Sequence, residues 1–102
     1  MFGVLPLEKE PEIQFNRTRV EIFASILSVA SKRALKTHIM YKANLSHRQL
    51  EKYVRFLMGN GMIIKVTDEI RGGSLYEITE KGLEFLKDYS RLSAHLTKSD
   101  SL

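Results

Sequence analysis

Apolar residues recur at helical spacing in two stripes between residues 17 and 30. One stripe contains Val20, Phe23, Ala24 and Leu27, and the other contains Ile22, Ile26 and Val29. Thr18 precedes Glu21 by three residues, which is the pattern of a capping box at the start of a helix. We therefore predict a helix over residues 17–30 that is apolar on more than one side and packs between neighbours at the centre of the core.

A short helix and a tight turn are predicted next. Thr37 can cap a short helix that ends at Lys42 or Ala43. Asn44 follows it and tolerates the left-handed backbone conformation that a tight turn requires. The preceding stretch, residues 34–36, is too short to assign.

A helix over residues 46–58 has two independent start signals. Ser46 and Gln49 form a second capping box, and Leu45 can pack on Leu50 as a hydrophobic staple. The apolar side of this helix consists of Leu50, Tyr53, Val54 and Leu57. A Gly-Asn-Gly run then ends the helix.

A β-hairpin follows this helix directly. Residues 62–67 are rich in β-branched side chains and predict a strand, with residues 75–78 as its partner. An Arg-Gly-Gly-Ser run at residues 71–74 lies at the turn. The two glycines would allow a two-residue turn, but that register would pair Asp68 with Glu77, so a longer loop remains an alternative.

Thr79 can cap a last helix over residues 80–96. Leu83 and Leu86 are expected to contact the domain, whereas Phe85, Tyr89, Leu92 and Leu96 form a heptad-like seam on another side. This seam predicts a homodimer; the alternative is that it covers the first helix within the same chain. Gly82 costs about 1 kcal/mol relative to alanine in a helix. Close approach of another backbone is a reason for its presence.

These elements predict an α+β fold that is mainly α. A three-helix core with a β-hairpin wing, a winged helix-turn-helix, is followed by an additional C-terminal helix. Residues 1–15 are interpreted as an N-terminal arm, 16–79 as the winged domain, 80–96 as the dimerisation helix and 97–102 as a flexible tail.

Composition excludes several classes of protein. The chain of 102 residues is 43% apolar and 27% charged and has no cysteine, so a single globular domain fits and a disulfide framework or thiolate metal site does not. The sequence has no secretory signal pattern and no long apolar run, so we expect a cytoplasmic protein without a membrane span. The three histidines lack metal-ligand spacing, and phosphate-loop, dinucleotide and nucleophile motifs are absent. We expect no metal, no cofactor and no enzymatic activity, and no small-molecule effector is evident.

The charge is concentrated in one segment of the chain. Residues 32–60 carry seven Lys or Arg against the single Glu51, although the whole chain has a net charge of only +4. A positive potential centred on this segment would attract a polyanion. The alternative is a solvated basic face without a partner.

The outer face of helix 46–58 carries the predicted DNA contacts. Arg48, Lys52 and Arg55 lie at positions i, i+4 and i+7, which places three cations in one row. Such a helix fits the major groove, where its N-terminal residues approach the bases. We expect Ser46, His47, Arg48 and Lys52 at base edges and Arg55 at a phosphate. The alternative is an ordinary amphipathic surface helix.

Two further groups of residues are candidates for contacts with the DNA backbone. At the hairpin tip, Arg71, Gly72 and Gly73 can approach a phosphate or the minor groove. Around the short helix, Lys36, Thr37 and Lys42 can contact the sugar–phosphate backbone, as can the adjacent Lys32 and Arg33. The tip is equally compatible with an ordinary glycine-rich turn.

The run from Thr37 to Tyr53, the Gly-Met-Ile run at residues 61–63 and the run from Tyr76 to Leu86 resemble one known family. The chain is similar to the small archaeal winged-helix DNA-binding proteins, which include nucleoid-associated dimers joined through the C-terminal helix and predicted transcriptional regulators. The resemblance implies DNA binding, a recognition helix at residues 46–58 and a dimerising helix at residues 80–96. Two departures are a shorter last helix and the arm 1–15, which has no counterpart in the family.

The resulting hypothesis is a DNA-binding winged-helix protein of the transcriptional-regulator type, acting on double-stranded DNA as a homodimer in the cytoplasm at the nucleoid. A winged-helix protein-interaction module and a non-specific nucleoid-associated protein that coats DNA are the alternatives. The interaction module would gain support if the chain's own arm covered the outer face of helix 46–58. RNA binding is less favoured because the sequence has no aromatic stacking platform.

Overall fold

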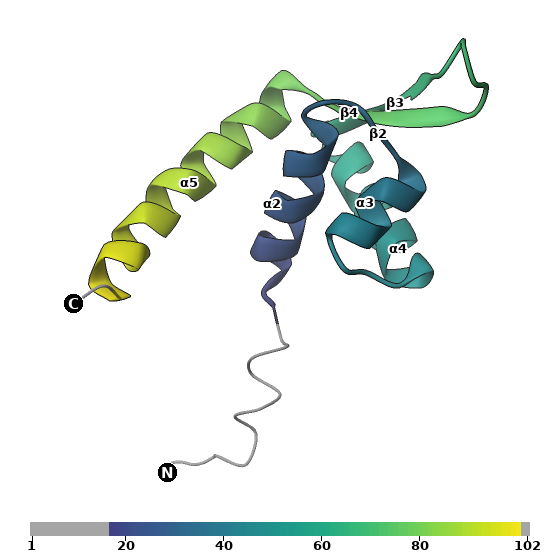
Figure 1. The fold of residues 1–102 in the computed structure, drawn as a ribbon. Coiled ribbons are helices and arrows are strands. Elements are labelled where there is room, and N and C mark those ends of the chain that lie inside the picture. Colours follow the sequence, from purple (N-terminus) through teal and green to yellow (C-terminus); the bar gives the residue numbers. More distant parts are fainter. Residues whose placement is uncertain (1–16, 101–102) are drawn as a thin grey trace.

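The computed structural model describes residues 17–100, with side chains up to residue 95. Its elements are α2 (Arg19–Ala30), β2 (Ala34–Leu35), α3 (Lys36–Lys42), α4 (His47–Gly59), β3 (Ile63–Thr67), β4 (Ser74–Ile78) and α5 (Glu80–Asp100). Helices α2, α3 and α4 form one body, from which the β3–β4 hairpin projects on one side and α5 leaves on the other (Figure 1). The predicted mainly α winged fold with an additional C-terminal helix is confirmed. None of the helices in the described range is long and apolar enough to cross a membrane.

Helix α2 is the centre of the core, as its two apolar stripes predict. The backbone N–H of Glu21 donates to Thr18 Oγ1 at 3.1 Å, and the Thr18 N–H donates to Glu21 Oε1 at 2.9 Å, so the first capping box is formed. Ile26 and Leu27 are fully buried. The helix contacts α3, α4, α5 and β4, so its apolar sides are covered by several neighbours.

Helices α3 and α4 form the helix-turn-helix. The capping box of Ser46 and Gln49 is present at the start of α4, and Leu45 and Leu50 are buried in the same core cluster. Asn44 adopts the left-handed conformation with φ of 57°. The prediction that Thr37 caps α3 is wrong: the helix begins at Lys36, and its N-cap is Leu35 without a side-chain cap. The reason is that β2 leads directly into the helix, which moves its start upstream.

The sheet has three antiparallel strands in the order β2-β4-β3. Thr67 pairs with Ser74 and Ile64 with Glu77, so a six-residue loop replaces the two-residue turn and the Asp68–Glu77 pair does not form. Asp68 organises this loop. Its Oδ1 accepts from the N–H groups of Ile70 and Arg71, each at 3.2 Å, and its carbonyl oxygen accepts from the Gly72 N–H at 2.7 Å.

Helix α5 packs closely against the base of the hairpin at Gly82. A Cβ on this residue would lie 2.4 Å from the Met62 carbonyl oxygen, so the predicted close backbone approach is confirmed. Phe85 and Leu86 pack against the core, whereas Leu83 is 42% exposed. The prediction that Leu83 contacts the domain and that Phe85 faces elsewhere is wrong, because Gly82, Phe85 and Leu86 share the helix face that meets the body.

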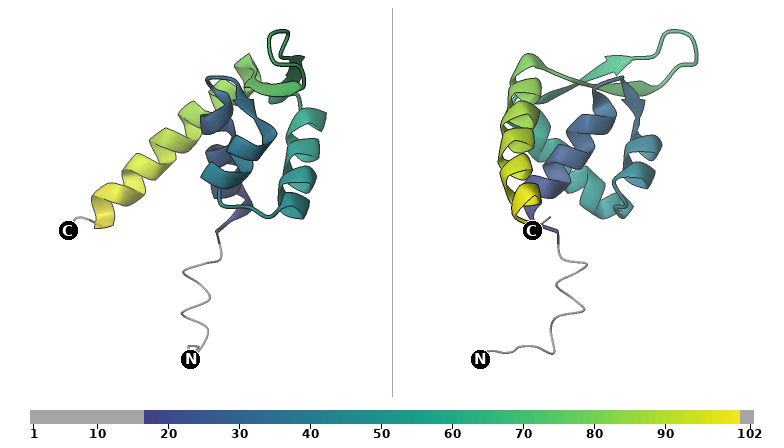
Figure 2. Two further views of the ribbon diagram at one scale, coloured as in Figure 1. Left: turned by 45° about the vertical axis from the view of Figure 1, so that its right-hand side comes forward. Right: turned by 60° about the vertical axis from the view of Figure 1, so that its left-hand side comes forward.

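The far part of α5 extends away from the three-helix body in Figure 1 and in the left view of Figure 2. The helix continues to Asp100, beyond its predicted end at residue 96. Leu92 is 58% exposed. The side chain of Leu96 and residues 1–16, which contain the predicted arm, lie outside the described part of the structure.

Candidate nucleic-acid interface

The outer face of α4 presents a row of cations. Leu50, Val54 and Leu57 are buried on the inner side of the helix, whereas Arg48, Lys52 and Arg55 are exposed. Among the side chains of residues 17–95, no carboxylate forms an ion pair with any of these three cations. Three positive charges along one helix face are therefore available to an anionic partner.

Glu51 modifies this charge pattern in a way that the sequence analysis missed. Its carboxylate forms an ion pair with Lys36 Nζ of α3, and its Oε2 lies 3.7 Å from His47 Nε2. Glu51 thus connects the start of α3 to α4 and is shared by two of the predicted DNA contacts. The i, i+4 spacing of His47 and Glu51 was a signal available in the sequence; the approach of Lys36 depends on tertiary structure.

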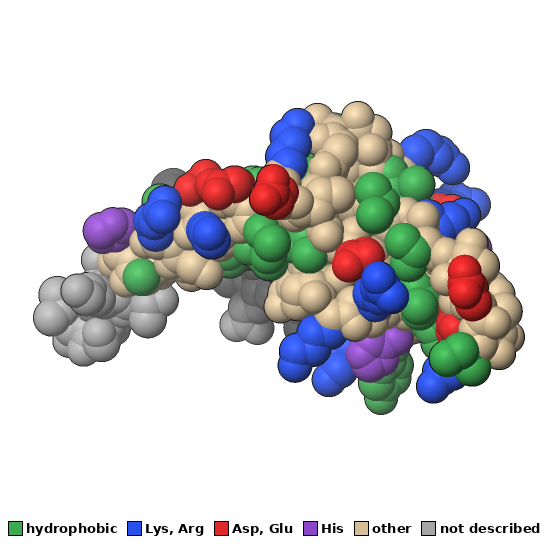
Figure 3. All heavy atoms as spheres, turned by 90° about the horizontal axis from the view of Figure 1, so that it is seen from above, with side chains coloured by type: hydrophobic (Ala, Val, Ile, Leu, Met, Phe, Trp, Pro, Cys, Tyr) green, Lys and Arg blue, Asp and Glu red, His purple; other side chains and the backbone are tan. Residues whose placement is uncertain are grey.

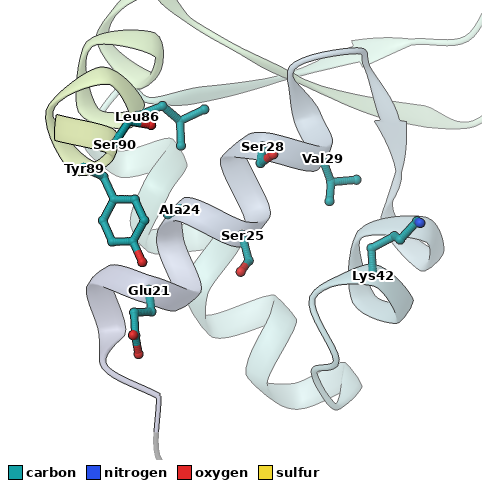
Figure 4. Close-up of a pocket in the computed structure, with 9 residues that line it drawn as sticks. All are labelled: Glu21, Ala24, Ser25, Ser28, Val29, Lys42, Leu86, Tyr89 and Ser90. Carbon is teal, nitrogen blue, oxygen red and sulfur yellow. The ribbon is translucent and has the colours of Figure 1, made fainter. Parts of the chain in front are cut away.

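The predicted contacts of the short helix are divided between two places. Lys36 and Thr37 lie beside the hairpin strands, where they line a cavity together with Lys65 of β3 and Ser74 of β4. Lys42 instead lines a cavity between α2 and α5, opposite Leu86 and Tyr89 (Figure 4). Neither α4 nor the hairpin borders that second cavity, so the structure does not bring Lys42 together with the cation row.

Two residues near α3 add candidates that the sequence analysis missed. Lys65 projects from β3, and its Nζ lies 5.9 Å from the centroid of the Tyr76 ring. Tyr41 of α3 is 84% exposed, and a phenol can donate a hydrogen bond to a phosphate oxygen. Seen from above, Lys and Arg side chains project from the three-helix body beside a histidine (Figure 3).

The hairpin tip is an exposed loop with a defined backbone. Gly72 and Gly73 have φ of 78° and 91°, a conformation that favours glycine, and Arg71 is exposed. The side chain of Arg71 has no ion pair within residues 17–95. Arg33, by contrast, is paired with Glu77 of β4, with Nε 3.3 Å from Oε1. The side chains described include no group of three or more histidine, aspartate and glutamate residues that could hold a metal ion.

Residues 16–97 match a family model described as winged helix-turn-helix. The chain belongs to the winged helix-turn-helix family. Within 70 aligned residues, this family member is 36% identical to an uncharacterized protein of Methanocaldococcus jannaschii. The match covers 68% of this chain and 66% of that protein, so it spans slightly less than two thirds of the relative's length.

Solved structures share the winged-helix fold of this chain. Sso10a-2, a DNA-binding protein from Sulfolobus solfataricus, has a TM-score of 0.67 and 24% identity, covering 83% of this chain and 90% of that one. The adhesin competence repressor AdcR of Streptococcus pyogenes has a TM-score of 0.71 and 17% identity over 95% and 80% of the two chains. An S. aureus MepR mutant bound to an oligodeoxyribonucleotide has a TM-score of 0.65 and 8% identity over 90% and 67%. The expected resemblance to small archaeal winged-helix DNA-binding proteins is confirmed.

Proposed function

We propose that this winged-helix protein binds double-stranded DNA as a transcriptional regulator, with α4 in the major groove. The observation that carries the proposal is the exposed row of Arg48, Lys52 and Arg55, which no described carboxylate neutralises. The inner side of α4 is buried in the core, so the helix can present this row without rearranging.

The position of each cation along α4 suggests its role. Arg48 lies in the first turn, the part of a recognition helix that approaches base edges most closely. Lys52 follows one turn later, and Ser46 and His47 flank the helix start. Arg55 lies in the next turn, where a phosphate is the expected partner. Arg and Lys in the major groove donate to guanine O6 and N7, which gives base selectivity.

Residues outside α4 would set the orientation of the protein on the duplex. Arg71, Gly72 and Gly73 at the wing tip would contact the backbone or the minor groove, because the loop is exposed and its backbone carries no bulky side chain at the two glycines. Lys36 and Thr37, beside Lys65, are placed for contacts with the sugar–phosphate backbone. Lys42 is a weaker candidate because it lines the α2–α5 cavity.

Dimerisation through α5 is a further part of the proposal. Phe85 and Tyr89 are already partly covered by their own chain, so fewer residues of the predicted seam are free for a partner. Leu92, further along α5, is exposed. Leu96 would continue the seam. Two copies joined there would carry two recognition helices, as small dimeric DNA-binding proteins do when they bind paired half-sites.

A competition assay with alanine variants tests the proposed function. Arg48→Ala and Lys52→Ala are expected to cost on the order of 1 to 3 kcal/mol on a preferred site and to reduce discrimination at one base pair. Arg71→Ala is expected to weaken all duplexes alike and to reduce the slope of log K against log salt by about 1 for each phosphate that the protein no longer binds. Lys87→Ala, an exposed cation on α5, is the matched control and should bind as the wild type does.

Two results have distinct meanings in this assay. Folded Arg48→Ala and Lys52→Ala proteins that bind every duplex with wild-type affinity would show that α4 does not face DNA, and a protein-interaction role would replace the proposal. Binding without any selected motif in a random duplex pool would instead favour the nucleoid-associated alternative over a regulator.

A further inference from the structure

An aromatic groove with a basic rim lies on the flank of α4 that faces α2. Phe23 of α2 stacks on Phe56 of α4, with ring centroids 5.1 Å apart and planes at 12°, and meets Tyr53 edge-on at 5.7 Å. The groove has a volume of about 550 Å³ and is bordered by three cations, Arg19, Lys52 and Arg55.

Two features of this groove favour an occupant that is both apolar and acidic. Phe56, the outer ring of the aromatic stack, is 51% exposed. Within residues 17–95, no carboxylate pairs with Arg19, Lys52 or Arg55. A segment that combines apolar side chains with carboxylates would cover the exposed Phe56 ring and neutralise the three cations.

The chain itself contains such a segment immediately before α2. Residues 1–16 carry apolar side chains at Phe2, Val4, Leu5, Leu7, Ile13 and Phe15. Between the two apolar groups lie Glu8, Glu10 and Glu12, which outnumber the single Lys9. The composition of this arm is therefore complementary to the groove in both polarity and charge.

Connectivity favours the chain's own arm over another partner. The groove includes Arg19 and Phe23, which belong to the first turns of α2, so the arm ends within a few residues of it. The Arg17 guanidinium donates to the Ala43 carbonyl oxygen at 2.6 Å, which anchors the start of the described chain beside the turn that leads into α4. Each extended residue spans about 3.3 Å, so residues 8–15 have ample length to reach the rim.

We propose that the N-terminal arm, residues 1–15, binds in the α2–α4 groove, with Ile13 or Phe15 against Phe23 and Phe56 and its glutamates facing Arg19, Lys52 and Arg55. Because Lys52 and Arg55 belong to the proposed DNA-binding row, the arm and DNA compete for them; this consequence rests on the proposed function. Cover of α4 that DNA does not displace would instead support the protein-interaction role. Tethering gives the arm a high effective concentration, so a weak contact is sufficient. The arm thereby acts as an autoinhibitory segment.

Paramagnetic NMR on the full chain tests the docking without DNA. The sequence has no cysteine, so Lys9→Cys creates a single site for a nitroxide label and leaves every apolar and acidic residue of the arm in place. The label is expected to broaden the amide signals of residues 19–23 and 52–56 and to leave α5 sharp. Absent or uniform broadening would overturn the proposal. A mixed sample of labelled and unlabelled chains is the control. Broadening that arises only between molecules would overturn the proposal, because the arm of one copy would then bind to another copy.

Binding to a DNA duplex tests the inhibitory consequence. If the arm occupies the groove about 90% of the time, removing residues 1–15 should tighten DNA binding about tenfold. Glu8→Gln, Glu10→Gln and Glu12→Gln together should act in the same direction in the intact chain. Phe56→Ala should reduce both the broadening and the difference made by the arm. Equal or weaker binding by the truncated chain would overturn the autoinhibitory role, and failure of every variant to bind DNA would refute the proposed function while the NMR result still decides the docking.

Discussion

Replacing Gly82 by alanine should destabilise the protein, although alanine is the better helix former. Gly82 lies in the first turn of α5, where the helix crosses the end of the hairpin. An added Cβ would lie 2.4 Å from the Met62 carbonyl oxygen and 2.6 Å from Ile78 Cγ1. That carbonyl oxygen accepts the Thr79 N–H at 3.0 Å, so it cannot retreat without weakening the bond that joins the hairpin to α5.

Three terms determine the size of the effect. Alanine gains about 1 kcal/mol of intrinsic helix stability over glycine. Overpacking against a rigid backbone costs about 1 to 3 kcal/mol or more. Loss or distortion of the Thr79 hydrogen bond adds about 0.5 to 1.5 kcal/mol. The expected net loss of unfolding free energy is therefore about 0.5 to 3.5 kcal/mol, which corresponds to a decrease in Tm of roughly 2 to 28 °C for a domain of this size.

Urea and thermal unfolding give the free energy of unfolding and the Tm of the variant and the wild type. Both proteins are compared at equal concentration, because a dimer would make Tm depend on concentration. Gly59→Ala in the last turn of α4 is the matched control: apart from its chain neighbours and the backbone of its own helix, nothing lies within 4 Å of its added Cβ, so a gain of up to about 1 kcal/mol is expected. A Gly82→Ala protein as stable as the wild type would refute the close-packing argument.

Three further substitutions test other parts of the structure. Ser46→Ala should remove the α4 cap and cost about 1 kcal/mol in urea unfolding, and an unchanged midpoint would contradict the capping role. Glu51→Gln should strengthen duplex binding and steepen the dependence of log K on log salt, because it removes the only carboxylate within residues 32–60; unchanged binding would place this face away from DNA. If the proposed dimer forms, light scattering should give about twice 11.7 kDa for the wild type and a monomer mass for Leu92→Asp; a wild-type monomer would refute dimerisation, and a Leu92→Asp dimer would place the interface elsewhere.

Local signals in the sequence predicted most of the fold. Both capping boxes form as expected, because each depends on residues three positions apart and on little else. Gly82 also indicated a close approach. Glycine lowers the stability of a helix, so its presence there suggests that another group occupies the space of a side chain. The exposed row on α4 follows from helical periodicity once the buried side is known.

Features that depend on distant residues could not be predicted in the same way. β2 consists of only Ala34 and Leu35 and exists because β4 pairs with it. The long loop of the wing depends on hydrogen bonds from the backbone to Asp68, and the rotation of α5 depends on where Gly82 meets the hairpin. The ion pair of Lys36 with Glu51 joins two helices, and neither residue indicates it alone.

An NMR titration of the full chain with a DNA duplex tests most directly whether α4 is the DNA-binding helix. We expect the amide shifts to be largest at Arg48, Lys52 and Arg55 of α4 and in the wing loop at residues 68–73, with α5 nearly unchanged. The buried inner side of α4 should stay protected throughout, because binding requires no rearrangement of the core. Shifts that gather in α5 and the α2–α5 cavity, with α4 and the wing unaffected, would contradict the assignment of α4 as the DNA-binding helix.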